Sequence, residues 1–172
     1  FGDESVDQDA LVAAALDVVR EALDDFTASR AREGEKLKAI ILERLARMRE
    51  RVAQVAPHIP AAQQAFQEKL KQRLVDAIGS ADDERVRQEV VVFAARIDVA
   101  EELARLATHM DEVERVLKQG GAVGKRLDFL MQELNREANT LGSKSVVSEV
   151  SQTAMDLKLL IEQMREQVQN LE

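Results

Sequence analysis

Cysteine is absent from the 172-residue sequence, which excludes disulfides, thiolate metal sites, iron–sulfur clusters and a cysteine nucleophile. The five aromatic residues are all phenylalanine, so the aromatic stacking platforms that grip unpaired bases are not expected. No uninterrupted apolar run approaches the ~18 residues that would cross a bilayer. The chemistry of this chain must therefore come from carboxylates, imidazoles, amides and basic side chains.

Glycine and proline are also scarce, with seven and two residues, so the chain has few turns. Alanine, leucine, glutamate, arginine and glutamine are abundant, and these residues favour long helices. No segment alternates strictly between apolar and polar residues, and no repeat of fixed period is evident. With 45% hydrophobic and 33% charged residues, the chain is too apolar for disorder and too charged for a membrane protein. The sequence predicts an all-α protein.

The spacing of apolar residues predicts about five helices, several of them long, which pair as antiparallel hairpins. Pro57 and Pro60 should end the first helix, because each proline disfavours helix in the residue before it. From Val99 onward the third helix has apolar steps of three and four residues, which is a heptad seam. The expected helices cover residues 9–55, 61–77, 83–118, 124–139 and 147–170, with Asp82 capping the third and a loop at 142–145.

The chain begins with Phe1 and an acidic stretch, without the positively charged region that opens a signal peptide. We therefore expect no signal peptide. The simplest interpretation is a piece cut or built from a longer protein.

A polar stripe follows one face of the third predicted helix, because its members are three or four residues apart. Carboxylate oxygens suit Mg²⁺ or Mn²⁺, and an imidazole suits the softer of these ions. His109 could instead move protons near neutral pH. The alternative, which spacing alone favours, is a solvated face with salt bridges between helical turns. The stripe consists of Asp98, Glu102, Arg105 and His109. Glu101 lies beside it, and Arg96 lies on the turn before it.

The fourth predicted helix carries two further polar stripes. The first consists of Asp128, Gln132, Asn135 and Asn139. Asparagine is a poor helix former, because its side chain competes with the backbone for hydrogen bonds, so Asn135 and Asn139 suggest a role other than stability. Glu133 and Glu137 form a second stripe beside them. The alternative is a polar helix that docks on another subunit through its amides.

The segment 119–144 is also more basic than the remainder of the chain. It has four Lys/Arg against three Asp/Glu, whereas the whole chain has a net charge of −8. The basic residues lie near the breaks around the fourth helix, where helix N-terminal amides can also meet phosphate. No phosphate-binding glycine loop, serine nucleophile elbow or zinc signature accompanies them.

Several stretches resemble the YicC family of bacterial proteins. They are residues 96–103 with Arg105 and His109, residues 124–129, residues 132–140, residues 143–144 and the ending 159–172. The resemblance is strongest from about residue 84 to 172 and weaker towards the start. It identifies residues 82–172 as the family's C-terminal helical domain and leaves residues 1–81 as a helical hairpin or connector region.

The resemblance implies a cytoplasmic, metal-dependent endoribonuclease from a family first described as stress-induced proteins. It implies Mn²⁺ or Mg²⁺ as cofactor and RNA as substrate. It also implies homo-oligomers, hexameric in the intact type, with other RNA-decay enzymes as further partners and no membrane. A full-length member has an additional N-terminal half, which helps to bind RNA and build the assembly and which this chain lacks.

Phosphodiester cleavage needs stabilisation of the charge on the phosphate, an activated nucleophile and a protonated leaving oxygen. We look for residues with these roles within the matching motifs. The candidate catalytic residues are Glu102, His109, Glu133 and Glu137. The candidate metal ligands are Asp98, Glu102, Asp128, Glu133 and Glu137. The candidate RNA-binding residues are Arg96, Arg105, Lys125, Arg126, Asn135, Arg136, Asn139 and Lys144.

The negative net charge argues against tight RNA binding by the whole surface and favours a local groove. We expect the third and fourth helices to dock face to face, so that Glu102 and His109 lie near Glu133 or Glu137. Two other classes remain open. A non-catalytic adaptor that binds RNA or a nuclease would need no carboxylate cluster, and a structural coiled coil would have no use for Lys125 or Asn139.

Overall fold

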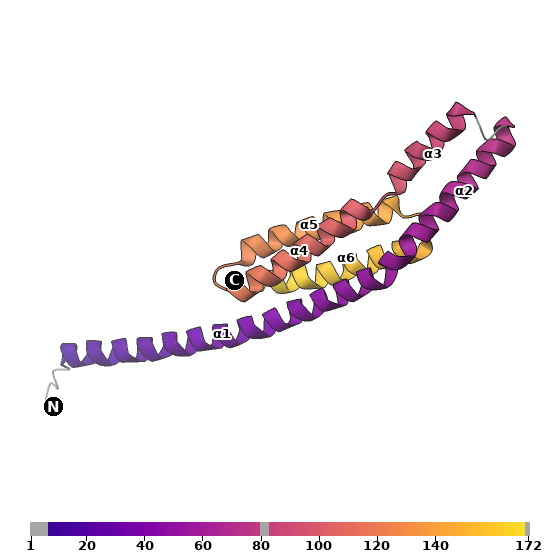
Figure 1. Ribbon diagram of the computed structural model, residues 1–172. Coiled ribbons are helices and arrows are strands. Elements are labelled where there is room, and N and C mark those ends of the chain that lie inside the picture. Colours follow the sequence, from indigo (N-terminus) through magenta and orange to yellow (C-terminus); the bar gives the residue numbers. More distant parts are fainter. Residues whose placement is uncertain (1–6, 80–82, 171–172) are drawn as a thin grey trace. The chain divides into compact units, whose positions relative to one another are not determined.

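The computed structural model describes residues 7–79 and 83–170, and these residues form six α-helices and one 3-10 turn without any strand. The predicted all-α class is confirmed. None of the helices within this described part is long and apolar enough to cross a membrane. The elements are α1 (Gln8–Val55), η1 (Ala56–His58), α2 (Ile59–Ile78), α3 (Glu84–Ile97), α4 (Ala100–Gln119), α5 (Gly124–Lys144) and α6 (Ser148–Gln169) (Figure 1).

The chain divides into two compact parts, one up to Ala39 and one from Ile40 onward, so the division falls inside α1. In the first part, Asp7 caps α1: its Oδ1 accepts the backbone N–H of Asp9 at 3.0 Å and of Ala10 at 3.3 Å. The helix then runs through Gly34 without a break. The domain boundary expected between residues 81 and 82 lies outside the described residues and stays a prediction.

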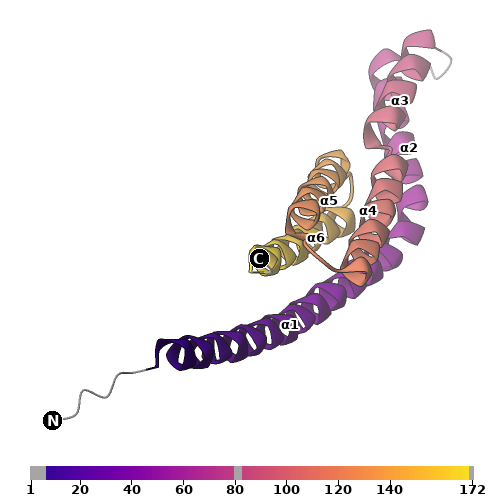
Figure 2. The same cartoon turned by 90° about the vertical axis from the view of Figure 1, so that its left-hand side faces the viewer.

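The core of the second part lies among α4, α5, α6 and the end of α1. Consecutive helices α4, α5 and α6 pack in pairs, which confirms the predicted antiparallel hairpins (Figures 1 and 2). Residues of α1 from Ile41 onward join the same apolar cluster. Its fully buried large side chains are Ile41, Leu45, Met48, Leu106, Leu127, Met131, Leu134, Leu141, Leu157, Ile161 and Met164.

Helices α2 and α3 form a separate hairpin, side by side in both views (Figures 1 and 2). Gly79 ends α2 with a φ of 86°, a left-handed conformation that favours glycine. Asp83 caps α3, because its side chain accepts the N–H of Arg85 at 2.8 Å. The cap expected at Asp82 lies outside the described residues.

The long third helix expected over 83–118 is wrong, because the chain breaks between α3 and α4. Asp98 is extended, with a ψ of 123°, and its Oδ1 accepts the N–H of Ala100 at 3.0 Å. A short acidic side chain next to a free helix N-terminus competes with the continuous helix. The heptad seam after Val99 concealed this start.

The prediction of a loop at 142–145 is also wrong for residues 142–144, because α5 continues to Lys144. Gly142 serves close packing here. A Cβ atom on it would lie 3.3 Å from the Cβ of Ala154 on α6. The expected break before α5 is confirmed at Gly120 and Gly121, which have φ values of 69° and 85°.

Candidate active site between α4 and α5

Helix α4 packs against α5 along a seam crossed by ion pairs, which confirms the expected face-to-face docking. The three pairs are Arg126 with Glu112, Arg105 Nε with Glu137 Oε1 at 3.2 Å, and Lys144 Nζ with Glu102 Oε1 at 2.8 Å. These pairs bring two of the sequence-predicted catalytic residues, Glu102 and Glu137, to one seam. The predicted approach of His109 to Glu133 stays a prediction.

Two glutamates of this seam are buried. Glu102 is 2% exposed and Glu137 is 5% exposed. Moving a carboxylate out of water costs several kcal/mol, roughly, and one ion pair often fails to repay it. Glu102 has a further deficit, because its Oε2 is buried without a hydrogen-bond partner in the described structure. Native structures rarely leave such atoms unpaired, so this carboxylate calls for a functional explanation.

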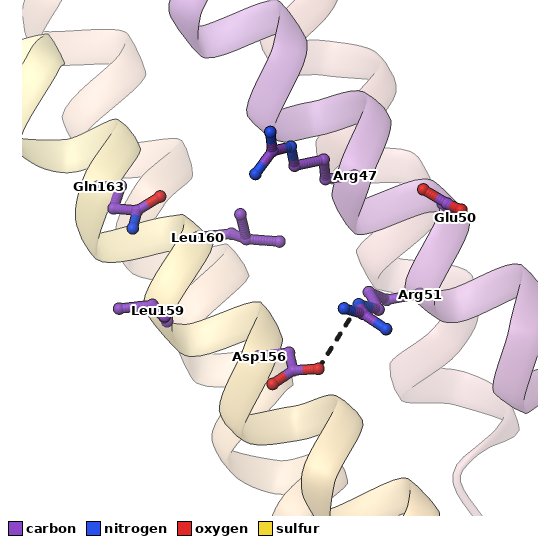
Figure 3. A pocket seen from close by; sticks show the side chains of 7 residues that line it. All are labelled: Arg47, Glu50, Arg51, Asp156, Leu159, Leu160 and Gln163. Atoms are coloured by element: carbon purple, nitrogen blue, oxygen red, sulfur yellow. Dashed lines mark ion pairs between the residues drawn. The ribbon is translucent and has the colours of Figure 1, made fainter.

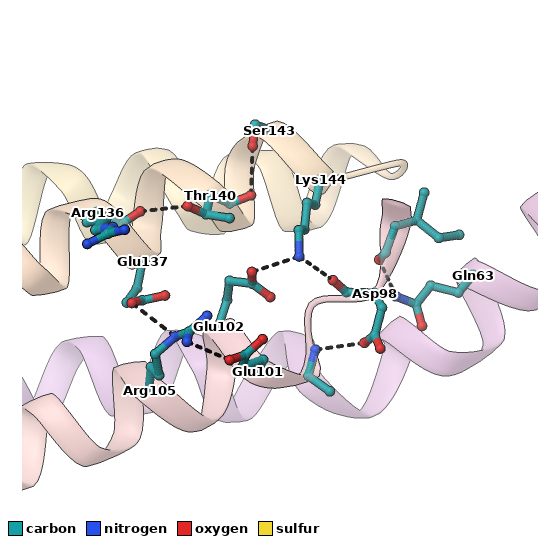
Figure 4. A network of polar contacts seen from close by, with 12 residues as sticks. Gln63, Asp98, Glu101, Glu102, Arg105, Arg136, Glu137, Thr140, Ser143 and Lys144 are labelled. Atoms are coloured by element: carbon teal, nitrogen blue, oxygen red, sulfur yellow. Dashed lines mark hydrogen bonds and ion pairs between the residues drawn. The ribbon is translucent and has the colours of Figure 1, made fainter. Parts of the chain in front are cut away.

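Arg105 pairs with two carboxylates, Glu137 across the seam and Glu101 on its own helix (Figure 4). Its Nε faces Glu137, and its Nη1 donates to Glu101 Oε1 at 2.5 Å. Burial lowers the pKa of the Arg105 guanidinium, but the charges of Glu137 and Glu101 outweigh this effect and raise the pKa overall. Arg105 is therefore a permanent cation beside the two buried glutamates.

Lys144 joins the end of α5 to the break between α3 and α4. Its Nζ donates to the backbone oxygen of Asp98 at 3.1 Å as well as to Glu102. Gln63 of α2 donates to the carbonyl of Ile97 at 2.5 Å on the other side of the break (Figure 4). Side chains from two other helices thus satisfy the carbonyls that the break frees. The Asp98 carboxylate is itself occupied, because it accepts the N–H of Ala100 at the start of α4.

His109 lies on the same face of α4 as Glu102 and is partly buried. Its Nδ1 atom is buried and has no hydrogen-bond partner within the described ranges. An imidazole with an uncommitted ring nitrogen could accept or donate a proton at this seam.

The predicted metal ligands are not all gathered at one place. Within residues 7–79 and 83–170, no group of three His, Asp or Glu side chains has the arrangement to hold a metal ion. Asp128 faces Arg165 of α6 at 3.7 Å and accepts from Gln132 at 2.8 Å. At the α4–α5 seam, Glu137 of α5 and Glu101 of α4 share the guanidinium of Arg105.

The predicted RNA-binding residues fall into two groups. Arg105, Arg126 and Lys144 are ion-paired to glutamates. The other members are exposed, and their side chains have no hydrogen bond or ion pair to any described residue. These exposed members are Arg96 on α3 and Lys125, Asn135, Arg136 and Asn139 on α5.

Two notable residues were missed by the sequence analysis. Gln63 has no local signal, because its partner Ile97 is 34 residues away in the sequence. Phe129 is 57% exposed on α5. Its position four residues after Lys125 and seven before Arg136 was a signal, because these intervals place all three on one helix face.

A pocket of about 390 Å³ lies between the end of α1 and α6 (Figure 3). Its charges compensate one another. Arg51 Nε lies 3.5 Å from Asp156 Oδ2, and Arg47 pairs with Glu43 at 2.8 Å. None of the described residues that line this pocket has a buried polar atom without a partner, as Glu102 has at the α4–α5 seam.

The fold and the seam together define an all-helical protein in which two buried glutamates pair with partly exposed cations across two packed helices. A family model described as "Endoribonuclease YicC-like, C-terminal" matches residues 53–172. The chain belongs to this family, which confirms the resemblance. Its relatives include a "Probable endoribonuclease YicC" of Haemophilus influenzae, 51% identical over 166 residues, which are 96% of the chain and 58% of the relative.

A second relative, the "Probable endoribonuclease YicC" of Clostridioides difficile, is 30% identical over 173 residues, covering 99% of the chain and 59% of that protein. The chain thus spans about three-fifths of the length of the curated relatives it matches. The names of these relatives place the family among probable endoribonucleases.

Proposed function

We propose that this chain carries the cleavage site of a metal-dependent endoribonuclease, with Glu102 and Glu137 as the ligands of Mn²⁺ or Mg²⁺. The observation that carries the proposal is the buried, unpartnered Oε2 of Glu102 beside a second buried glutamate. An oxygen of this kind has the charge and the free lone pairs that a hard cation requires.

Two carboxylates fit this role without a third protein ligand. Mg²⁺ usually keeps several waters and is held by one or two carboxylates together with substrate phosphates. The lack of a three-ligand cluster in the described part of the chain is compatible with such a site. A bound divalent cation would neutralise charge on the phosphate and increase the acidity of a bound water.

The protein's own residues have separate tasks in this proposal. Arg105, which now contacts Glu137, would donate to a non-bridging phosphate oxygen and stabilise its growing negative charge. Lys144 would hold the Glu102 side chain in place through their ion pair. His109 would transfer a proton through its Nδ1, which has no partner in the described structure.

The proposal extends to the whole protein by family membership. Its substrate is RNA, and its working form is a cytoplasmic homo-oligomer that includes the part of the relatives not matched by this chain. Asp98 and Asp128 are secondary ligand candidates, because Asp98 accepts the N–H of Ala100 and Asp128 pairs with Arg165.

The test is cleavage of labelled RNA in Mn²⁺, Mg²⁺ or EDTA. Internal cuts should need metal and should be lost in a Glu102→Gln, Glu137→Gln double variant. A Glu162→Gln, Glu166→Gln variant is the matched control, because both residues are exposed on α6. Circular dichroism would establish that the variants remain folded. Cutting that persists in EDTA, or in the folded seam variant, would reject the proposal.

A second candidate is an adaptor that binds RNA without cutting it. It is favoured by one observation: Lys125 and Arg136 are exposed on α5 without a partner in the described structure, whereas Arg105 and Lys144 are held by glutamates. RNA that is bound but remains intact in every metal would support this candidate.

A further inference from the structure

The face of α5 that points away from the core has an unusual composition. Leu127, Leu130 and Leu134 mark the buried face of this helix. The opposite face, at helical steps of three and four residues, is exposed and almost wholly polar. We call it the α5 outer face, and it consists of Lys125, Phe129, Gln132, Arg136, Asn139 and Ser143.

Phe129 is the exception on this face. It is 57% exposed, and no other large apolar side chain of α5 is exposed. Surfaces that dock proteins usually present contiguous apolar patches. An isolated aromatic ring among cations and amides instead matches surfaces on which single-stranded nucleic acid stacks its bases.

The charges around Phe129 suit the same ligand. Lys125 precedes it by one helical turn, about 6 Å along the axis, and Arg136 follows about 10 Å further on. Neither cation has an acidic partner among the described residues, so each is available to a phosphate. The adjacent Arg126 is different, because Glu112 of α4 already neutralises it.

We propose that the α5 outer face binds unpaired RNA, with a base stacked on Phe129 and phosphates at Lys125 and Arg136. Asn139 supplies an amide donor and acceptor to base edges or sugars, and Gln132 supplies its carbonyl oxygen, since its amide nitrogen donates to Asp128. The inference rests on the proposed function and narrows its substrate to RNA with unpaired bases. Bases within an A-form duplex are stacked on one another and cannot offer a free face to Phe129.

The experiment measures binding in EDTA, so that cleavage does not contribute. Fluorescence anisotropy would compare a short labelled RNA that cannot pair with itself and the same RNA in a duplex. Phe129→Ala should weaken binding of the unpaired RNA by about 5- to 150-fold. Phe129→Trp should retain it, because a larger ring also stacks.

Two further variants separate stacking from charge and from general apolar contact. Leu159→Ala removes an apolar side chain that is 61% exposed on α6 and should leave binding unchanged. Lys125→Ala should reduce the slope of log affinity against log salt by about 0.7, the value for one phosphate contact in a single strand. Phe129→Ala should leave this slope as it is.

The proposal is overturned if Phe129→Ala binds unpaired RNA as the wild type does, if both RNA forms weaken equally, or if the wild type binds neither form. It is also overturned if Phe129→Ala changes the oligomeric state by light scattering and leaves RNA binding unchanged, since the face would then contact protein. If RNA binding depends on Phe129 but no metal-dependent cleavage occurs, this inference holds and the nuclease function is rejected. If metal-dependent cleavage and RNA binding are both unaffected by Phe129→Ala, the nuclease function holds and this inference is rejected.

Discussion

Glu102 and Lys144 form an ion pair whose two members differ in burial, and this difference decides how the stability of the protein should respond to mutation of each. Glu102 is 2% exposed, whereas the Lys144 side chain is 31% exposed. A neutral residue at 102 would leave the lysine in contact with water. A neutral residue at 144 would leave a buried carboxylate without its cation.

We therefore predict that Lys144→Met destabilises the protein more than Glu102→Gln does. Leaving a buried acceptor unsatisfied costs about 1–3 kcal/mol, and more when it is charged. Urea unfolding at neutral pH measures the difference, with Lys158→Met on the exposed face of α6 as control. Equal losses of stability in the two seam variants would show that the pair is not buried in this way.

Glu112 gives a prediction about acid stability. Hydrogen bonds from Arg115 and Arg126 lower the pKa of its carboxyl to about 2 in the folded protein. In the unfolded chain this pKa returns to roughly 4.3, so the stabilisation is complete above that value and is lost as the pH falls towards 2.

Glu112→Gln should consequently lower the melting temperature at pH 7 and have little effect near pH 2. Thermal unfolding followed by circular dichroism across this range is the measurement. A difference between wild type and variant that stays constant from pH 7 to pH 2 would contradict the assigned ion pairs.

Among the structural elements, the turn between α4 and α5 sets the register of the whole seam. Gly120 has a φ of 69° and a ψ of −166°, a conformation that side chains strongly disfavour. Gly34 lies in the interior of α1, and a Cβ atom there would meet no atom within 4 Å. The two glycines should therefore respond to alanine in opposite directions.

Gly120→Ala should destabilise the protein by about 1–3 kcal/mol, because the alanine must adopt a strained backbone. Gly34→Ala should increase helix stability by about 0.5–1 kcal/mol. Chemical unfolding measures the stability of the Gly120→Ala variant, and helix content during heating measures that of the Gly34→Ala variant. A Gly120→Ala protein as stable as the wild type would show that the turn can adopt another backbone conformation.

Most helices could be predicted because apolar spacing and chain breakers act locally. The break at Asp98 could not, because a local cap there competes with a heptad seam that continues past it. Gly142 misled the analysis for a similar reason. It was interpreted as a turn, but it permits close contact with Ala154 across two helices.

The candidate site was only partly predictable. Spacing placed Glu102, Arg105 and His109 on one face, and this is a property of a single helix. It could not show that Arg105 meets Glu137 or that Lys144 meets Glu102, because these contacts depend on the register between α4 and α5. Burial of the two glutamates follows from the same register.

At the scale of the whole molecule, the proposed RNA binding has to be local, because a net charge of −8 repels a polyanion from most of the surface. The α4–α5 hairpin carries both the buried seam and the basic α5 outer face, so one hairpin could hold RNA and present its phosphate to the carboxylates. This arrangement makes the two buried glutamates the central claim about the molecule.

Electron paramagnetic resonance of Mn²⁺ tests that claim most directly. Titration in the presence of a short unpaired RNA should show bound Mn²⁺ with the wild type and with Glu162→Gln. Binding should fall at least tenfold in Glu102→Gln and in Glu137→Gln, a loss of ~1.4 kcal/mol or more. If both folded seam variants bound Mn²⁺ as tightly as the wild type, the α4–α5 seam would not be the metal site.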